Sequence, residues 1–268
     1  VTLVSHAQIN LEYWPYEKKN VQERKVIDHR YTSESAVKYH KRIHRVIDLR
    51  QKQNKPMVWP KSNVVEILYT AAIKGPNRED GLIAYKSELL DKGEKYAPTE
   101  VQGLGSDTIL VQTIDTTGDD DENIIDVEMP VLLDRASIKK IKIMEDWIFD
   151  HKYSDFRVRI VGIAPLYNVS ASGIDLGEQP LFWIKMDDAR KLLVNKEVFN
   201  PYNDLRTLSF DDWFEQRLFS SYIVKESNVF DTPIKDQEAF EDDGLSQLLE
   251  SDRIKNDLFI FEHDNWEY

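Results

Sequence analysis

Two histidines spaced four residues apart, His40 and His44, are the first side chains in this sequence that could bind a metal together. On a helix this spacing places two imidazoles on one face, as in zinc sites. The intervening residues include Lys41 and Arg42, and the glutamate that zinc proteases carry within this spacing is absent. Because two neighbouring cations repel a divalent metal, we interpret the pair as part of a charged, outward helix face and predict no metal site.

A run of four acidic residues, Asp119 to Glu122, offers the clustered oxygen ligands that calcium prefers. An EF-hand loop requires acidic residues at alternating positions, a glycine at the sixth position and a glutamate at the twelfth. Counted from Asp115, the sixth residue is Asp120, and Gly118 stands at the wrong position. The run is therefore interpreted as a solvated acidic loop.

Acid–base catalysis requires carboxylates held close together, and Glu145, Asp146 and Asp150 lie in one short run. Asp146 and Asp150 fall on the polar side of an alternating pattern, where pairing with cations of a neighbouring strand explains them. The candidate cations are Lys142, Arg157 and Arg159. Glu145 falls on the apolar side of the same pattern. It therefore needs an arginine partner or a bulge that turns it outward, and it is the place where an active site could lie.

Sequence motifs for nucleotide binding and nucleophilic catalysis are incomplete in this chain. Gly103-Leu104-Gly105 lacks the third glycine and the following helix of a dinucleotide loop. A nucleophile elbow of the type GxSxG and a glycine loop ending in lysine are both absent. The sequence has no cysteine, which excludes disulfides, thiolate metal ligands and a cysteine nucleophile. We predict no catalytic residue, no cofactor and no enzymatic activity.

The elements that position these side chains centre on residues 140–186. The first part alternates between apolar and charged positions, which is typical of a half-buried strand. Its apolar positions are Ile141, Ile143, Trp147 and Phe149. A second alternating run over 156–160 follows a short polar break, as in a hairpin. The third run, 181–184, is apolar throughout and is typical of a central strand covered on both faces. These strands predict a mixed or antiparallel sheet.

Apolar residues at helical spacing predict several helices packed over this sheet, and the expected fold class is α+β. The predicted helices cover residues 33–53, 63–74, 209–221 and 252–262, with a brief helix over 187–194. The helix over 209–221 has the clearest pattern, because Phe210, Phe214 and Leu218 recur every four residues and Ser209 can cap its start.

The N-terminal residues 1–34 form an arm in which no periodic pattern persists. Tyr13, Trp14 and Tyr16 surround Pro15, and proline favours an extended or turning path. Termini need a docking site to be ordered. The arm could therefore fold back on its own domain or lie across a neighbouring subunit, and the sequence leaves both alternatives open.

The remaining domain, residues 35–268, contains one irregular segment at 86–137, which we interpret as a variable excursion. It contains a turn of helix after Pro98, a strand over 108–114 and an acidic loop over 116–123. The whole chain is 268 residues long, 41% hydrophobic and 31% charged, as in an ordinary globular protein. It carries a net charge of −13, which argues against nucleic-acid binding. No stretch approaches the length of a membrane span, so we expect no direct membrane insertion.

Runs in four stretches of this sequence resemble one known family. MEDWIFD, RVRIVGIAPL and QPLFWIKM lie in the central stretch, IDLRQKQNKPM lies at 47–57, and two C-terminal runs cover 209–231 and 248–268. In this order they are similar to the GldN/PorN proteins of the Bacteroidetes type IX secretion and gliding motility machinery. The resemblance also allows residues 46–57 to run as a strand and turn instead of the end of a helix.

The resemblance implies a non-enzymatic structural subunit of a ring in the periplasm. Its implied partners are an outer-membrane lipoprotein of the GldK/PorK type, which would provide the attachment to the membrane, and the periplasmic part of a GldM/PorM-type protein. Because the chain starts at Val1 and not at methionine, removal of a secretory signal is one expectation.

A ring requires two different contact patches on each subunit. We predict that these patches are formed by aromatic residues near the two termini, which are Tyr13, Trp14, Tyr16, Trp266 and Tyr268. The alternative is a soluble periplasmic enzyme or ligand-binding protein with a deep polar pocket around Glu145.

Overall fold

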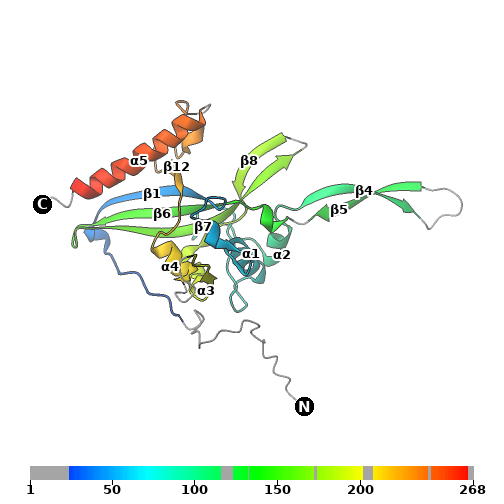
Figure 1. The fold of residues 1–268 in the computed structure, drawn as a ribbon, viewed down its shortest axis with the longest axis horizontal. Coiled ribbons are helices and arrows are strands. Elements are labelled where there is room, and N and C mark those ends of the chain that lie inside the picture. Colours follow the sequence, from blue (N-terminus) through cyan, green and yellow to red (C-terminus); the bar gives the residue numbers. More distant parts are fainter. Residues whose placement is uncertain are drawn as a thin grey trace, which may run out of the picture.

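The computed structural model describes residues 24–115, 123–131, 133–171, 174–201, 208–240 and 243–264. Its centre is a curled antiparallel sheet with the strand order β12-β1-β6-β7-β8, to which the short β9 is added beside β7. These strands are β1 (Val37–Asp48), β6 (Lys140–Asp150), β7 (Asp155–Ala171), β8 (Ile174–Pro180), β9 (Ile184–Lys185) and β12 (Tyr222–Glu226). Helices lie on both faces of this sheet (Figure 1), and the predicted α+β class is confirmed.

The predicted hairpin at the centre of the chain is confirmed. β6 and β7 pair from Lys140 opposite Leu166 to Asp150 opposite Asp155. The prediction of a central strand over 181–184 is wrong, because the strand beyond β7 is β8 and only Ile184 belongs to β9. The run is nevertheless buried. Its apolar character on both sides arises because Phe182 packs in the main core while Trp183 packs in a smaller cluster.

The helix predicted over 33–53 is wrong, since most of this segment is the strand β1. Ile43, Val46 and Ile47 follow helical spacing, but β-branched residues favour strands. β1 pairs with both β12 and β6. Its alternation of apolar residues is interrupted by Lys41 and Arg45, so the period of two is hidden and the spacing of three and four stands out instead. The alternative that the resemblance allowed is closer, because β1 ends at Asp48 in a turn that leads to a 3₁₀ helix at Lys55–Met57.

Four helices cover one face of the sheet, and they are α1 (Val64–Lys74), α2 (Pro98–Gly103), α3 (Met186–Leu193) and α4 (Phe210–Glu215) (Figure 1). The prediction for α1 is confirmed, with Asn63 as its cap and Gly75 as its end. Ser209 caps α4 as predicted, but α4 ends at Glu215 and does not reach 221. Its end is followed by Arg217 in a left-handed conformation (φ 52°), which cannot continue a helix.

The other face is partly covered by the long helix α5 (Gly244–Asp264), which lies along β12 (Figure 1). It includes the predicted 252–262 but begins eight residues earlier. The α5 residues Ile254 and Leu258 are buried, as their spacing predicts. The Ser251 hydroxyl accepts a hydrogen bond from the Ile223 backbone N–H at 2.9 Å. This hydrogen bond uses a backbone N–H of the edge strand β12 that would otherwise be free to pair with a strand of another chain.

The main hydrophobic core lies between the sheet and the helices α1, α3 and α4, where Phe182, Phe210 and Phe214 are almost completely buried. A second cluster lies beneath α5. A third surrounds Trp183. Within the described ranges, no helix combines the length and apolar character needed to cross a membrane.

A two-stranded ribbon projects from this body, formed by β4 (Asp107–Asp115) and β5 (Asn123–Val131) (Figure 1). It confirms the strand predicted at 108–114, and α2 confirms the helical turn after Pro98. The predicted acidic loop at Asp119 to Glu122 lies outside the described residues. Two further pairs of short strands are β2 (Val58–Trp59) with β3 (Ser62–Asn63) and β10 (Glu197–Val198) with β11 (Leu208–Ser209).

Candidate functional site

Glu145 is completely buried on β6 and is paired with an arginine. Its Oε2 accepts hydrogen bonds from Arg217 Nη2 at 3.1 Å and from Trp147 Nε1 at 3.2 Å. Its Oε1 lies 2.9 Å from the same Arg217 nitrogen, in a charge contact without hydrogen-bond alignment. The pairing of β6 with β7 shifts by one residue between Met144 and Glu145. The sequence required an arginine or a bulge at this position, and the structure has both.

The surroundings of Glu145 differ from those of a ligand site. Burial lowers the pKa of the nearby Arg45 guanidinium, and the Glu145 carboxylate acts in the opposite direction by stabilising its charge. The structure has a groove beside the start of α5 and a shallower hollow near Pro60 and Arg135, and Glu145 lines neither of them. The role of its carboxylate is therefore structural, because its ion pair with Arg217 connects β6 to the turn after α4.

The His40 and His44 pair lies on the strand β1, so the predicted outward helix face is wrong. His40 is half exposed and lies 3.4 Å from Asp146. His44 is buried edge-on against Trp183, with ring centroids 6.2 Å apart. Among the residues that the structure describes, no three histidine or acidic side chains come together to hold a metal.

Burial lowers the pKa of His44 to about 4, and the charges of Lys142, Lys225 and Arg42 act in the same direction. Glu88, at 3.6 Å from Nδ1, opposes this shift without overcoming it. His44 is therefore neutral in the folded protein at pH values where an unfolded histidine becomes protonated. Its contribution to stability is complete above the unfolded pKa of about 6.5 and is lost as the pH falls towards about 4.

We expect the free energy of unfolding to fall by about 2 kcal/mol from this group alone between pH 7.5 and pH 5.0. Urea unfolding of the wild type and of His44→Gln at both pH values would measure it. In His44→Gln, the free energy of unfolding should fall between pH 7.5 and pH 5.0 by about 2 kcal/mol less than it does in the wild type. In the control His40→Gln, which alters the half-exposed histidine, the fall should be as large as in the wild type. An unchanged pH dependence in His44→Gln would contradict a buried neutral imidazole.

The acidic residues beside Glu145 form ordinary charge pairs, as predicted, although one partner differs. Asp146 accepts two hydrogen bonds from Arg42 of β1, at 2.7 and 2.8 Å, and not from β7. Asp150 is buried and lies 3.4 Å from Arg157, one of the predicted cations. Each carboxylate has a cation of a neighbouring strand, so this group needs no catalytic explanation.

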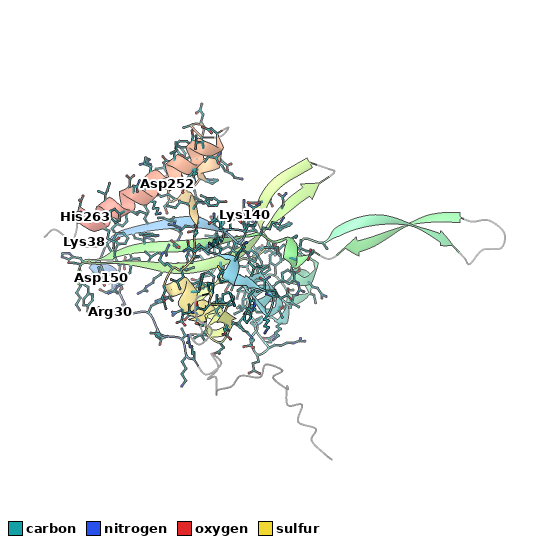
Figure 2. The ribbon with its side chains drawn as sticks, in the orientation of Figure 1. Arg30, Lys38, Lys140, Asp150, Asp252 and His263 are labelled. Atoms are coloured by element: carbon teal, nitrogen blue, oxygen red, sulfur yellow. The ribbon has the colours of Figure 1, made fainter. Side chains whose placement is uncertain are left out.

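The aromatic residues predicted as contact patches lie outside the described residues, at both ends of the chain. They are Tyr13, Trp14, Tyr16, Trp266 and Tyr268. The adjoining residues 24–32 lie on their own domain, where Arg190 donates a hydrogen bond to the Ile27 carbonyl at 2.9 Å and Arg157 donates one to Thr32 at 3.0 Å. Figure 2 shows Arg30, Lys38 and Asp150 together at the end of the sheet opposite the ribbon.

A surface that the sequence interpretation missed lies on α5. Besides its buried residues, this helix carries an outer stripe of large apolar side chains that are 50–65% exposed. The outer stripe consists of Leu245, Leu248, Leu249, Phe259 and Ile260. A helix that is apolar on opposite sides is normally buried on both. The spacing of these leucines was visible in the sequence, but only the position of the buried residues shows that they form a second face.

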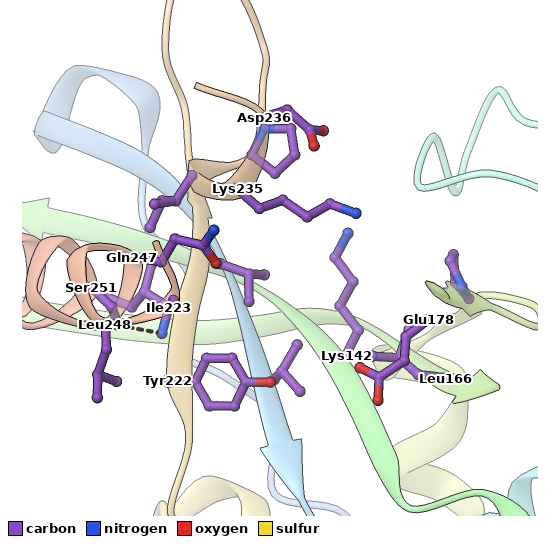
Figure 3. Close-up of a pocket in the computed structure, with 16 residues that line it drawn as sticks. Lys142, Leu166, Glu178, Tyr222, Ile223, Lys235, Asp236, Gln247, Leu248 and Ser251 are labelled. Carbon is purple, nitrogen blue, oxygen red and sulfur yellow. Dashed lines mark hydrogen bonds between the residues drawn. The ribbon is translucent and has the colours of Figure 1, made fainter. Parts of the chain in front are cut away.

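A groove of about 690 Å³ opens beside the start of α5, and we call it the β12–α5 groove. Residues of five strands line its floor, among them Tyr222 of β12, Val46 of β1, Lys142 of β6, Leu166 of β7, and Glu178 and Pro180 of β8. The 3₁₀ turn Ile234–Asp236 and the first turns of α5 form its walls (Figure 3). Leu248 belongs to both the groove and the outer stripe, so the two surfaces are continuous.

Comparison with known proteins places the chain in a family. A search of curated proteins found no match. The sequence model of a family described as "Gliding motility associated protein GldN" matches residues 32–267. This match covers the sheet and the helices on both of its faces, and it begins just before β1. The chain therefore belongs to the GldN family of gliding motility associated proteins.

Proposed function

We propose that this chain is a structural subunit of the periplasmic ring of the type IX protein secretion system. In this proposal it assembles with an outer-membrane lipoprotein of the GldK/PorK type and contacts the periplasmic part of a GldM/PorM-type protein. Family membership supports the setting, because the family is associated with gliding motility. The protein is attached to the outer membrane through its lipoprotein partner and has no catalytic role.

The observation that carries this proposal is the outer stripe of α5. Five large apolar residues face away from the sheet along this helix, and each is at least half exposed. The stripe falls into two apolar groups, because the exposed polar residues Asp252 and Asn256 lie on the same side of the helix between Leu249 and Phe259. Exposed apolar groups rimmed by polar residues mark protein–protein interaction sites. A role centred on Glu145 is not proposed, because its carboxylate is buried against Arg217.

The test is co-expression with the lipoprotein partner, followed by light scattering and negative-stain imaging. The wild-type pair should form a large ring or arc. Leu249→Glu/Ile260→Glu should weaken the association at least tenfold, since charges placed in an apolar interface are costly. The matched control is Val229→Glu/Phe230→Glu, which changes two exposed apolar residues outside the stripe.

Circular dichroism must show that both double variants remain folded. Association that is unchanged in Leu249→Glu/Ile260→Glu would remove the outer stripe as the contact surface. A wild-type chain that stays monomeric beside the lipoprotein would overturn the proposed function itself.

A further inference from the structure

The outer stripe of α5 has the same chemistry on both sides of the helix midpoint. The helix contains 21 residues, and Ile254 is the central one. Leu248 and Leu249 precede Ile254 by six and five residues. Phe259 and Ile260 follow it by five and six residues. All four side chains are at least half exposed. The stripe therefore contains two apolar groups that are placed symmetrically about the middle of one helix.

The residues between the two apolar groups include one side chain of each charge. Asp252 and Lys255 flank the helix midpoint, and both are exposed. Neither of them forms an ion pair with another described residue. Arg253 differs, because it is paired within its own helix with Glu250 and Asp257. An acidic and a basic side chain are therefore available to a partner molecule close to the centre of the stripe.

A second copy of α5, placed antiparallel on this stripe, matches both features. When a two-fold axis passes at the height of Ile254, Leu248 lies opposite Phe259 of the partner subunit. Asp252 then lies opposite Lys255 of the partner subunit. Both contacts recur on the other side of the axis with the roles exchanged, because a two-fold contact is self-complementary. A parallel arrangement would instead place each of these charges beside its own copy, and like charges repel. The pattern therefore favours the antiparallel arrangement.

We propose that two copies of this chain pair through α5, with their outer stripes packed antiparallel against each other. The occupant is a second copy because the stripe is complementary to itself in both its apolar groups and its charges, which an unrelated partner would not require. No described element covers the far side of α5, so the stripe is accessible (Figure 1). A contact of this kind closes on itself, and the ring would be built from pairs that a second contact joins. This inference rests on the proposed function and deepens it, since it names the partner of the same stripe.

Sedimentation and light scattering of the full chain across a concentration series measure the pairing. Two helices of this length overlap over about 30 Å, which gives a small interface, and we expect a dissociation constant on the order of micromolar. Leu248→Glu/Phe259→Glu should raise this constant at least tenfold, because it places carboxylates in an apolar contact. Leu248→Ala/Phe259→Ala serves if the glutamates change the fold. The matched control Val229→Glu/Phe230→Glu alters exposed apolar residues outside the stripe and should pair as the wild type does. Unchanged pairing in the stripe variants would overturn the inference.

Disulfide trapping tests the antiparallel order, and the chain has no cysteine of its own. Chains with Leu248→Cys and chains with Phe259→Cys should form a mixed disulfide when they are oxidised together with diamide, because the two residues face each other. Either variant alone should form none. Identical residues are separated by at least about 15 Å along the helix, and a disulfide joins Cα atoms only roughly 4.4–6.8 Å apart. Linkage of Leu248→Cys to itself, or the absence of the mixed disulfide, would overturn the antiparallel contact.

Co-expression with the lipoprotein partner separates this inference from the proposed function. If both hold, the wild type forms large complexes, while Leu248→Glu/Phe259→Glu still binds the lipoprotein but stops at small ones. A wild-type chain that is monomeric alone at every concentration, yet forms large complexes with the lipoprotein, would overturn the pairing and leave the proposed function intact. Wild-type pairs that do not associate with the lipoprotein would overturn the proposed function and leave the pairing intact. Loss of lipoprotein binding with unchanged self-association in Leu248→Glu/Phe259→Glu would assign the stripe to the lipoprotein and overturn this inference.

Discussion

Replacing Arg217 with methionine should lower the free energy of unfolding by about 3–5 kcal/mol, because it removes the ion-pair partner of the buried Glu145 carboxylate and leaves it only the charge of the nearby Arg45. Glu145 has no exposed surface, and Arg217 contributes both its hydrogen bond at 3.1 Å and its charge contact at 2.9 Å. The Trp147 indole supplies one remaining hydrogen bond, which cannot replace the lost charge. Equilibrium unfolding in urea at pH 7 measures the difference.

Two further variants separate this cause from a general loss of packing. Removing both charges in Glu145→Met/Arg217→Met should recover most of the lost stability, because a well-packed apolar pair can replace a buried ion pair without loss. Arg253→Met removes an arginine whose ion pairs with Glu250 and Asp257 are mostly solvent-exposed, and it should cost roughly 1 kcal/mol or less. If Arg217→Met is no more harmful than Arg253→Met, the Glu145–Arg217 pair does not hold the turn after α4 to the sheet.

Replacing Phe182 with alanine should destabilise the fold by about 3–5 kcal/mol, through the loss of buried apolar surface and the cavity left behind. Phe182 is 1% exposed in the main core, and its ring lies 5.8 Å from that of Tyr69. Phe230→Ala is the matched control, because it is the same chemical change at a side chain that is 83% exposed. It should alter stability by about 0.5 kcal/mol or less. Equal effects of the two substitutions in urea unfolding would show that Phe182 is not part of the core.

The sequence predicted elements well where one periodic pattern dominated. The alternation of Ile141 and Ile143 with charged residues marked β6, and Asn63 and Gly75 marked both ends of α1. Prediction failed for β1, because the charged residues Lys41 and Arg45 interrupt its period of two and leave apolar residues at a spacing that imitates a helix. It also failed to extend α5 to Gly244, since the apolar residues of its first turns lie on the outer stripe and are out of phase with Ile254 and Leu258.

The candidate surfaces were predictable in part. A carboxylate on an apolar strand face must be neutralised, so the sequence alone required a partner for Glu145. That partner, Arg217, lies 72 residues further along the chain in a turn that was predicted as helix, and no local pattern connects the two residues. The groove could not be predicted, because its floor joins residues of five strands whose order is set by long-range pairing.

The sequence by itself determined the family, the α+β class, the β6–β7 hairpin and the need to neutralise Glu145, since each of these depends on neighbouring residues or on recognisable runs. The tertiary structure alone decided the strand order, the two apolar faces of α5 and the projection of the ribbon. The physical reason is that local sequence specifies the periodicity of each element. Which surfaces stay uncovered depends on how distant elements pack, and the surfaces available to a partner are those that remain after this packing.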